Sequence, residues 1–171
     1  MLFFTTGNDK EKNYTLSAEQ AFDTYSNMVW RLALTKTGSK SMADDILQDV
    51  FVAYLRKNPK FYDKEHLKAW LLRVTLNCSN NSLKSTWHSR SVELDVEYVA
   101  SIENTSEVYF EVLKLPIKYR TVIHLHYYEG YSVKEIASIC KTKESTIKTR
   151  LFRAREQLKQ TLKGEEFDVC R

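Results

Sequence analysis

The segment 131–162 constrains the fold more than any other part of the chain, because its apolar residues follow a helical repeat. They recur at steps of four, three, four and four residues and give one helix a continuous apolar stripe: Ile147, Leu151, Ala154, Leu158 and Leu162. A shorter helix is expected before it, because Ser132 and Glu135 have the spacing of a capping box. Two short helices, the second with a cationic outer face, are typical of a helix-turn-helix. We therefore expect this segment to contact the major groove of DNA.

The rest of the chain also favours helices. Four glycines and two prolines among 171 residues suit an all-α fold with few strand turns. Apolar spacing predicts a helix over 15–36 that Gly38 ends, a second from Ser41 to Asn58-Pro59, a third after Glu65, and short helices on either side of Pro116. Ser41 and Asp44 have capping-box spacing, so the second helix is expected to start at Ser41.

Charge is strongly segregated along the chain. Residues 56–90 carry eight basic and two acidic side chains, and residues 113–163 carry twelve basic and four acidic ones. Residues 91–111 carry six acidic side chains and no basic one. Two basic blocks around an acidic spacer favour two nucleic-acid contacts on one chain. The alternative is that the basic side chains only form solvated helix faces.

The spacer also sets the expected domain boundaries. Residues 88–106 are rich in Ser, Glu and Asp and lack a strong helical period. A linker of that length inside one compact domain would be unusual, and its like charges keep it extended. We therefore expect an all-α chain of two small helical domains, 1–87 and 107–171, joined by a flexible acidic linker.

With these elements placed, the chain resembles the extracytoplasmic-function (ECF) sigma factors, sigma-70 family subunits of bacterial RNA polymerase. The resemblance covers about residues 15–86 and 107–163. It rests on MADDILQDVF at 42–51, AWLLRVTLN at 69–77, LPIKYRTVIHLHYYEGYSVKEIA at 115–137 and STIKTRLFRAREQL at 145–158. The ordered combination of these segments, separated by a variable linker, is specific.

The resemblance implies a non-enzymatic factor, without a cofactor, that directs promoter recognition, DNA melting and transcription initiation. The first domain would bind the clamp of the polymerase largest subunit and open the −10 element. The second would read the −35 element and contact the polymerase flap. An anti-sigma factor is the expected regulator, and the cytoplasm is the expected location. The alternative is an ordinary helix-turn-helix regulator with an unrelated amino-terminal interaction domain.

An acidic face is expected on the second helix. Asp45, Gln48 and Asp49 share one side of it, turned away from the apolar stripe. An acidic patch on an otherwise basic protein suits a basic partner, which by resemblance is the clamp of core RNA polymerase. For Asp44 we favour a different role, compensation of the dipole at the helix start.

Contacts with the −10 strand are expected around the third helix. Asparagine amides offer a donor and an acceptor that match the edges of unpaired bases, and aromatic rings stack on bases. By resemblance, the residues that meet this strand are Phe61, Tyr62, Arg73, Asn77, Asn80 and Asn81, with Lys64, Lys68 and Lys84 on phosphates. Phe61 and Tyr62 look exposed. For Asn77 the alternative is a helix-packing hydrogen bond, and for Trp70 we favour a core position.

The second helix of the helix-turn-helix carries the clearest predicted site. By resemblance, its base-facing residues are Lys148, Thr149, Phe152 and Arg153. Lys148 and Arg153 can donate to guanine or phosphate, and the Phe152 ring can contact a thymine methyl. The predicted contacts with backbone phosphates are Arg150, Arg155 and Lys159. For Arg150 and Arg155 the alternative is an exposed ion pair with Glu156 or Glu135, which contributes only ~0–1 kcal/mol.

The turn before that helix departs from the family pattern. Many relatives carry Gly where Lys141 and Ser145 stand, so Lys141 is expected to adopt a turn geometry that Gly allows freely. Lys143 replaces a common capping hydroxyl, so Thr142 is the expected N-cap.

Other functions are disfavoured. His124 and His126 are two residues apart on an expected helix and face different directions, so a zinc site with Cys140 is not expected. The cysteines Cys78, Cys140 and Cys170 are odd in number and far apart, as suits reduced thiols. No apolar run approaches the ~20 residues of a membrane span, and no motif has catalytic spacing. We expect no metal, no membrane insertion and no catalytic residue.

Overall fold

The computed structural model describes residues 14–87 and 107–162. Its elements are α1 (Ala18–Thr37), α2 (Lys40–Lys57), α3 (Lys64–Trp87), α5 (Glu107–Lys114), α6 (Ile117–Ile123), η1 (His124–Tyr128), α7 (Val133–Ile139) and α8 (Glu144–Thr161). In this part of the chain the one extended pairing is an isolated bridge between Tyr14 and Phe61. The all-α prediction is confirmed. The predicted linker 88–106 lies outside the described residues.

Local sequence signals explain the ends of α1 and α2. Gly38 ends α1 with a φ of 72°, and Asn58 ends α2 with a φ of 40°. The predicted start of α2 is wrong, because Ser39 is the N-cap and its hydroxyl accepts from the amide of Met42. Asp44, one turn further on, accepts from the indole of Trp30 and pairs with Lys40 instead of closing a capping box with Ser41. The tertiary contact with Trp30 therefore overrides the local pattern.

The helix-turn-helix consists of α7 and α8. Ser132 and Glu135 form the predicted capping box at the start of α7. Lys141 adopts the predicted left-handed geometry, with a φ of 51°. The expected cap at Thr142 is wrong, because Lys143 occupies the N-cap of α8 without a side-chain hydrogen bond and the Thr142 amide donates to the carbonyl of Ala137. The turn is held by backbone bonds, so it does not need a capping hydroxyl.

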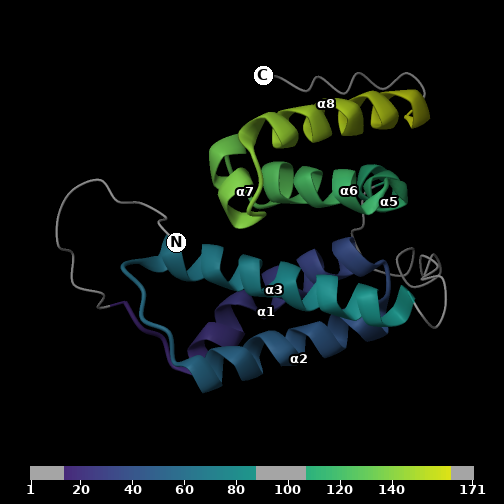
Figure 1. The fold of residues 1–171 in the computed structure, drawn as a ribbon. Coiled ribbons are helices and arrows are strands. Elements are labelled where there is room, and N and C mark those ends of the chain that lie inside the picture. Colours follow the sequence, from purple (N-terminus) through teal and green to yellow (C-terminus); the bar gives the residue numbers. More distant parts are fainter. Residues whose placement is uncertain (1–13, 88–106, 163–171) are drawn as a thin grey trace.

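The helices form two layers, with α1, α2 and α3 below and α5 to α8 above (Figure 1). One core lies among the three lower helices, where Val29, Ile46, Val50, Leu67 and Leu71 are fully buried. This burial is the main stabilising term for that bundle.

A second core joins the two layers. Three leucines of the lower helices pack outside the core of their own bundle and contact Leu125 and Ile136 of the upper helices. They are Leu32, Leu72 and Leu76. Helix α6 rests on α1, and α7 on α3. The two halves are therefore docked on each other through a shared apolar core, a contact that the sequence pattern did not predict.

Candidate nucleic-acid interface

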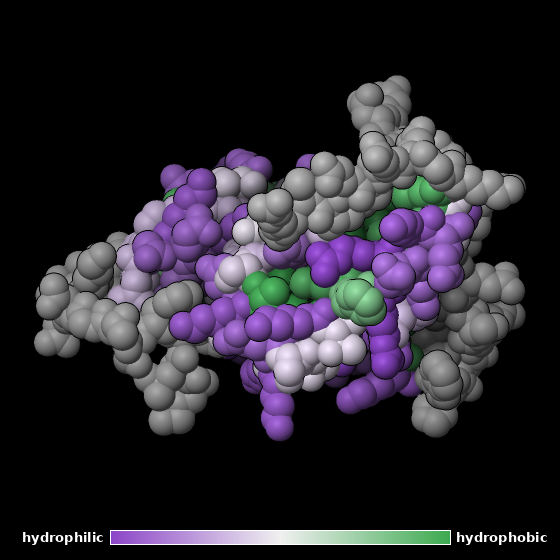
Figure 2. All heavy atoms as spheres, turned by 90° about the horizontal axis from the view of Figure 1, so that it is seen from above, coloured by the Kyte–Doolittle hydropathy of each residue, from purple (hydrophilic) through white to green (hydrophobic). Residues whose placement is uncertain are grey.

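Helix α8 divides into a buried and an exposed face. Ile147, Leu151, Ala154 and Leu158 are buried as predicted. The four predicted base-facing side chains, Lys148, Thr149, Phe152 and Arg153, are all exposed. The face seen over α8 is mostly hydrophilic, with a small hydrophobic patch near its middle (Figure 2). The exposed fraction of Phe152 is 60%, so its ring is accessible to a partner.

The predicted phosphate contacts flank this face. Lys159 is exposed, and Arg150 and Arg155 are half-buried. Among residues 14–87 and 107–162, none of the ion pairs uses Arg150 or Arg155, so the expected alternative with Glu156 or Glu135 does not form there. Their charges remain available to an anionic partner.

The predicted −10 residues do not all share one surface. Asn77, Asn80 and Asn81 are exposed along α3, and within the described chain their amides make no side-chain hydrogen bond. The helix-packing alternative for Asn77 is therefore not favoured. All three amides are free to meet a base edge.

The two aromatic residues before α3 differ in their exposure to solvent. Tyr62 is 44% exposed and stacks on His66. The expected exposure of Phe61 is wrong, because the ring is 1% exposed and packs between Tyr54 and Trp70. The backbone bridge to Tyr14 fixes that burial, since it ties the loop to the start of the chain. Phe61 is a core residue and cannot stack on a base, whereas Tyr62 can.

Two basic residues of α3 contact the upper layer. Arg73 donates to the carbonyl of Ser138 at 3.3 Å, and Nζ of Lys68 lies 3.4 Å from Oε2 of Glu129. Both were expected to face DNA. In the docked arrangement they hold α7 and the end of η1 against α3, so either residue must release these partners before it meets a phosphate.

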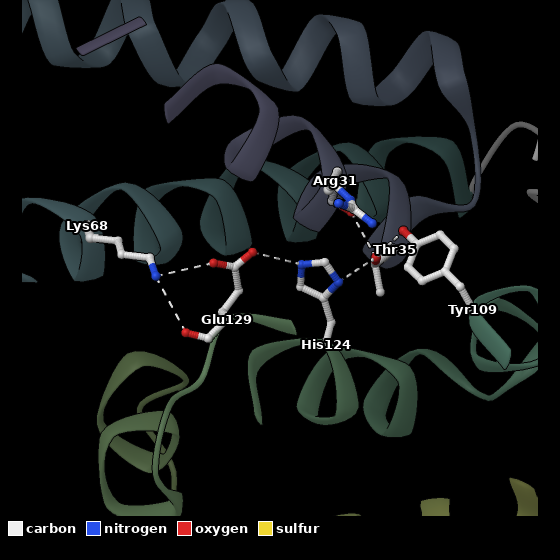
Figure 3. Close-up of polar contacts among 6 residues, drawn as sticks. All are labelled: Arg31, Thr35, Lys68, Tyr109, His124 and Glu129. Carbon is white, nitrogen blue, oxygen red and sulfur yellow. Dashed lines mark hydrogen bonds and ion pairs between the residues drawn. The ribbon is translucent and has the colours of Figure 1, made fainter. Parts of the chain in front are cut away.

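The Lys68 contact is one end of a polar chain that crosses the junction (Figure 3). Glu129 lies between Lys68 and the buried ring of His124, whose Nε2 is 3.5 Å from Oε1 of Glu129. The other ring nitrogen, Nδ1, is 3.1 Å from the hydroxyl of Thr35, and that hydroxyl lies 3.0 Å from the phenol of Tyr109. Burial acts to raise the pKa of Glu129, but His124 and Lys68 outweigh it and lower that pKa.

This chain of contacts gives the docked arrangement a specific register, because buried polar groups need partners that only one alignment supplies. Sequence reasoning missed it, since it weighed His124 only as a metal ligand. In the described part of the chain, no three His, Cys, Asp or Glu residues gather as a metal site would require.

The predicted acidic face of α2 is exposed at Asp45, Gln48 and Asp49. One and two turns further along, Val52 and Leu55 continue the same side, and Leu55 is 63% exposed. The expected acidic face did not include these two residues, although each stands seven residues after a member of that face. The face is therefore acidic at one end and apolar at the other.

Burial raises the pKa of the thiols of Cys78 and Cys140, so both stay protonated at neutral pH and react slowly. The third, Cys170, lies outside the described residues. Among the helices that the structure describes, none combines the length and the apolar character needed to cross a bilayer.

A three-helix bundle with exposed asparagines, docked on a helix-turn-helix with an exposed cationic helix, defines a two-part, all-helical protein of the helix-turn-helix class. Comparison with known sequences specifies the family. The pattern of Sigma-70 region 2 matches residues 21–89, and that of Sigma-70, region 4 matches residues 106–158. The two matches correspond to the lower and the upper layer.

Curated relatives agree. The ECF RNA polymerase sigma factor SigW of Bacillus subtilis is 29% identical over 161 residues, which cover 82% of this chain and 86% of the relative. The ECF RNA polymerase sigma factor SigM of the same organism is 29% identical over 158 residues, covering 84% and 94%. This chain belongs to the sigma-70 family, in its ECF group.

Solved structures share the fold. The sigma factor RpoE from Bartonella quintana, in complex with the anti-sigma factor NepR, gives a TM-score of 0.69 at 22% identity and covers 86% of this chain and 97% of its own. CnrH, in complex with the cytosolic domain of CnrY, gives a TM-score of 0.60 at 26% identity, covering 85% and 86%.

Proposed function

We propose that this chain is a sigma factor that directs core RNA polymerase to its promoters and starts transcription there. One observation carries the proposal: regions 2 and 4 of the sigma-70 family follow each other on one chain, and the second presents four exposed side chains on its recognition helix. The activity consists of binding, without a catalytic residue or cofactor.

The two halves have different binding roles. In the domain 107–171, α8 reads the −35 element through Lys148, Thr149, Phe152 and Arg153. In the domain 1–87, α2 binds the polymerase clamp through its acidic and apolar face, and α3 holds the separated −10 strand. The strand contacts are Tyr62, Asn77, Asn80 and Asn81, with Arg73 added once it leaves Ser138.

Coupling between the two contacts provides the specificity. When polymerase holds both halves, the second DNA contact becomes intramolecular and gains effective concentration. The free chain is expected to bind promoter DNA weakly and with a steep dependence on salt. The docked arrangement must open on that path, because Lys68 and Arg73 contact the upper layer within it.

A protein with this role works where polymerase and chromosome meet, so we propose a cytoplasmic location. The sigma factor RpoE, which shares this fold, is bound to the anti-sigma factor NepR in its solved structure. We expect an anti-sigma factor to control this chain as well, by binding one or both of its halves.

Run-off transcription tests the proposal. Core polymerase mixed with the full chain and genomic fragments should start RNA at defined positions, and core polymerase alone should not. Mapping those starts identifies the −35 and −10 sequences. If the chain binds DNA but never confers initiation on core enzyme, it is an ordinary helix-turn-helix regulator and the sigma assignment fails.

Replacing Arg153 with alanine should weaken −35 recognition by about 1–3 kcal/mol without unfolding the domain, because this exposed side chain contributes base contacts but no core packing. The measurement is holoenzyme affinity for a mapped promoter and for single-base variants of its −35 element. Gln160→Ala, an exposed change nearer the end of α8, serves as the matched control. Unchanged base preference in Arg153→Ala would remove Arg153 from the groove.

Replacing Asp49 with lysine should reduce capture of core polymerase at least about tenfold, because it places like charges across a basic interface. The binding titration uses labelled full chain and purified core enzyme. Asp23→Lys makes the same charge change on the exposed surface of α1 and should leave the affinity unchanged. Equal core affinity in all three proteins would exclude the acidic face of α2 as the clamp contact.

A further inference from the structure

A pocket of about 350 Å³ lies between the recognition helix and α6. Helix α8 supplies one wall with Thr146, Thr149, Arg150 and Arg153, and the first turn of α6 supplies the other with Lys118 and Tyr119. Two of these residues, Thr149 and Arg153, are also predicted base contacts. The pocket therefore flanks the groove-facing surface of α8 directly, and α6 extends that surface beyond the helix-turn-helix.

The charge of the pocket is of one sign. Lys118, Arg150 and Arg153 line it, and no carboxylate does. None of the ion pairs within the described ranges involves these three cations. A pocket with three cations and no counter-charge attracts an anion.

Tyr119 connects the pocket to base reading. Its ring is buried, so its position is fixed by the core. Arg153, which lines the same pocket, lowers the pKa of the Tyr119 phenol, and Nζ of Lys118 lies 4.9 Å from the centre of the ring. A long arginine side chain on an exposed helix face is otherwise free to rotate. The Tyr119 hydroxyl is an acceptor on the side of α8 that opens on the pocket, where it can orient the guanidinium of Arg153.

The geometry of DNA identifies the occupant. An α-helix with its side chains measures about 10–12 Å across and nearly fills a major groove about 12 Å wide. The phosphate chains that border the groove then run along both flanks of the helix. The pocket occupies one flank of α8 and adjoins the groove-facing surface at Thr149 and Arg153.

We propose that this pocket receives a backbone phosphate of the promoter at the −35 element, with Lys118 and Arg150 as the phosphate contacts and Tyr119 as the residue that positions Arg153. The proposal rests on the −35 function proposed above and adds α6 to the DNA-contacting surface. Lys118 contributes affinity without sequence preference, and Tyr119 contributes preference through the arginine it holds.

Lys118→Ala tests the phosphate contact in the holoenzyme, on a promoter mapped by run-off transcription. One lost phosphate contact lowers the slope of log affinity against log salt by about one, so the loss between 50 and 200 mM salt should become about threefold smaller. Base preference should not change. Lys114→Ala is the matched control, because Lys114 pairs with Glu111 and lies outside the pocket. An unchanged salt slope in Lys118→Ala overturns the phosphate assignment.

Tyr119→Phe tests the positioning role, since it keeps the packed ring and removes the hydroxyl. Preference at the base pair read by Arg153 should relax severalfold, with an unchanged urea midpoint. An unchanged preference overturns the role of Tyr119. Arg153→Ala in the same assay distinguishes a failure of the −35 function from a failure of the pocket proposal. If Arg153→Ala has no effect, the −35 function itself fails. If Arg153→Ala has an effect and the Lys118 and Tyr119 variants have none, only the pocket proposal fails.

Discussion

Replacing Leu72 with alanine is expected to lower the free energy of unfolding by about 2–4 kcal/mol, because it opens a cavity in the core that joins the two halves. The side chain is fully buried there with Leu32, Val112 and Leu125. If the halves did not dock, Leu72 would lie on the surface of the lower bundle, and truncating it would change stability by less than about 0.5 kcal/mol. Urea unfolding of the full chain distinguishes the two values.

Leu71 is the matched comparison for Leu72. It is the preceding residue on the same helix and equally buried, but it packs in the core of the lower bundle. Both alanine variants should be destabilised, with different spatial patterns of hydrogen exchange. Leu72→Ala should speed exchange in α6 and α7, whereas Leu71→Ala should act mainly on α1 and α2. Identical exchange maps would contradict the shared core.

Replacing Arg120 with methionine should lower the free energy of unfolding by about 2–4 kcal/mol, because one buried and one part-buried carbonyl lose a charged donor. Its Nη1 donates to the carbonyl of Leu113 at 2.7 Å and its Nη2 to that of Lys36 at 3.0 Å. These carbonyls stand at the ends of α5 and α1, where helices leave acceptors unpaired. One guanidinium therefore caps two helices that belong to different halves.

The same urea titration measures this change. Lys134→Met, which removes a cation from the exposed side of α7, should shift stability by less than about 0.5 kcal/mol. Arg120→Lys should recover only part of the loss, because an ammonium lacks the planar fork that reaches both carbonyls. A stable Arg120→Met protein would show that water can replace the guanidinium at both helix ends and that Arg120 does not couple the halves.

Periodicity alone predicted the parts of this protein that depend on local spacing. The stripe from Ile147 to Leu158 determined which side of α8 is buried, and so which side faces a partner. Ser132 with Glu135, and Gly38, marked helix ends correctly because a cap depends on a few neighbouring residues. The same stripe, with the cationic outer face opposite it, indicated the helix-turn-helix, and the family resemblance then assigned its base-facing residues.

Local spacing failed where a distant residue competed for the same group. The carboxylate of Asp44 accepts a hydrogen bond from Trp30 instead of forming the expected cap. The backbone bridge to Tyr14 holds Phe61 in the core. Lys118 and Tyr119 lie beside Arg153 only because α6 packs along α8. None of these contacts leaves a periodic trace, because each joins residues far apart in the sequence.

The sequence by itself determined the helices, the caps at Gly38 and Ser132, and the chemical character of each face of α8. Only the tertiary structure decided that Leu72 belongs to a core shared by both halves, and that Lys68 reaches Glu129 across it. The physical reason is the distance along the sequence over which each kind of interaction acts. A helix is specified within a few turns by hydrogen bonds and apolar spacing, whereas docking depends on the fit of two complete surfaces, which no single segment encodes.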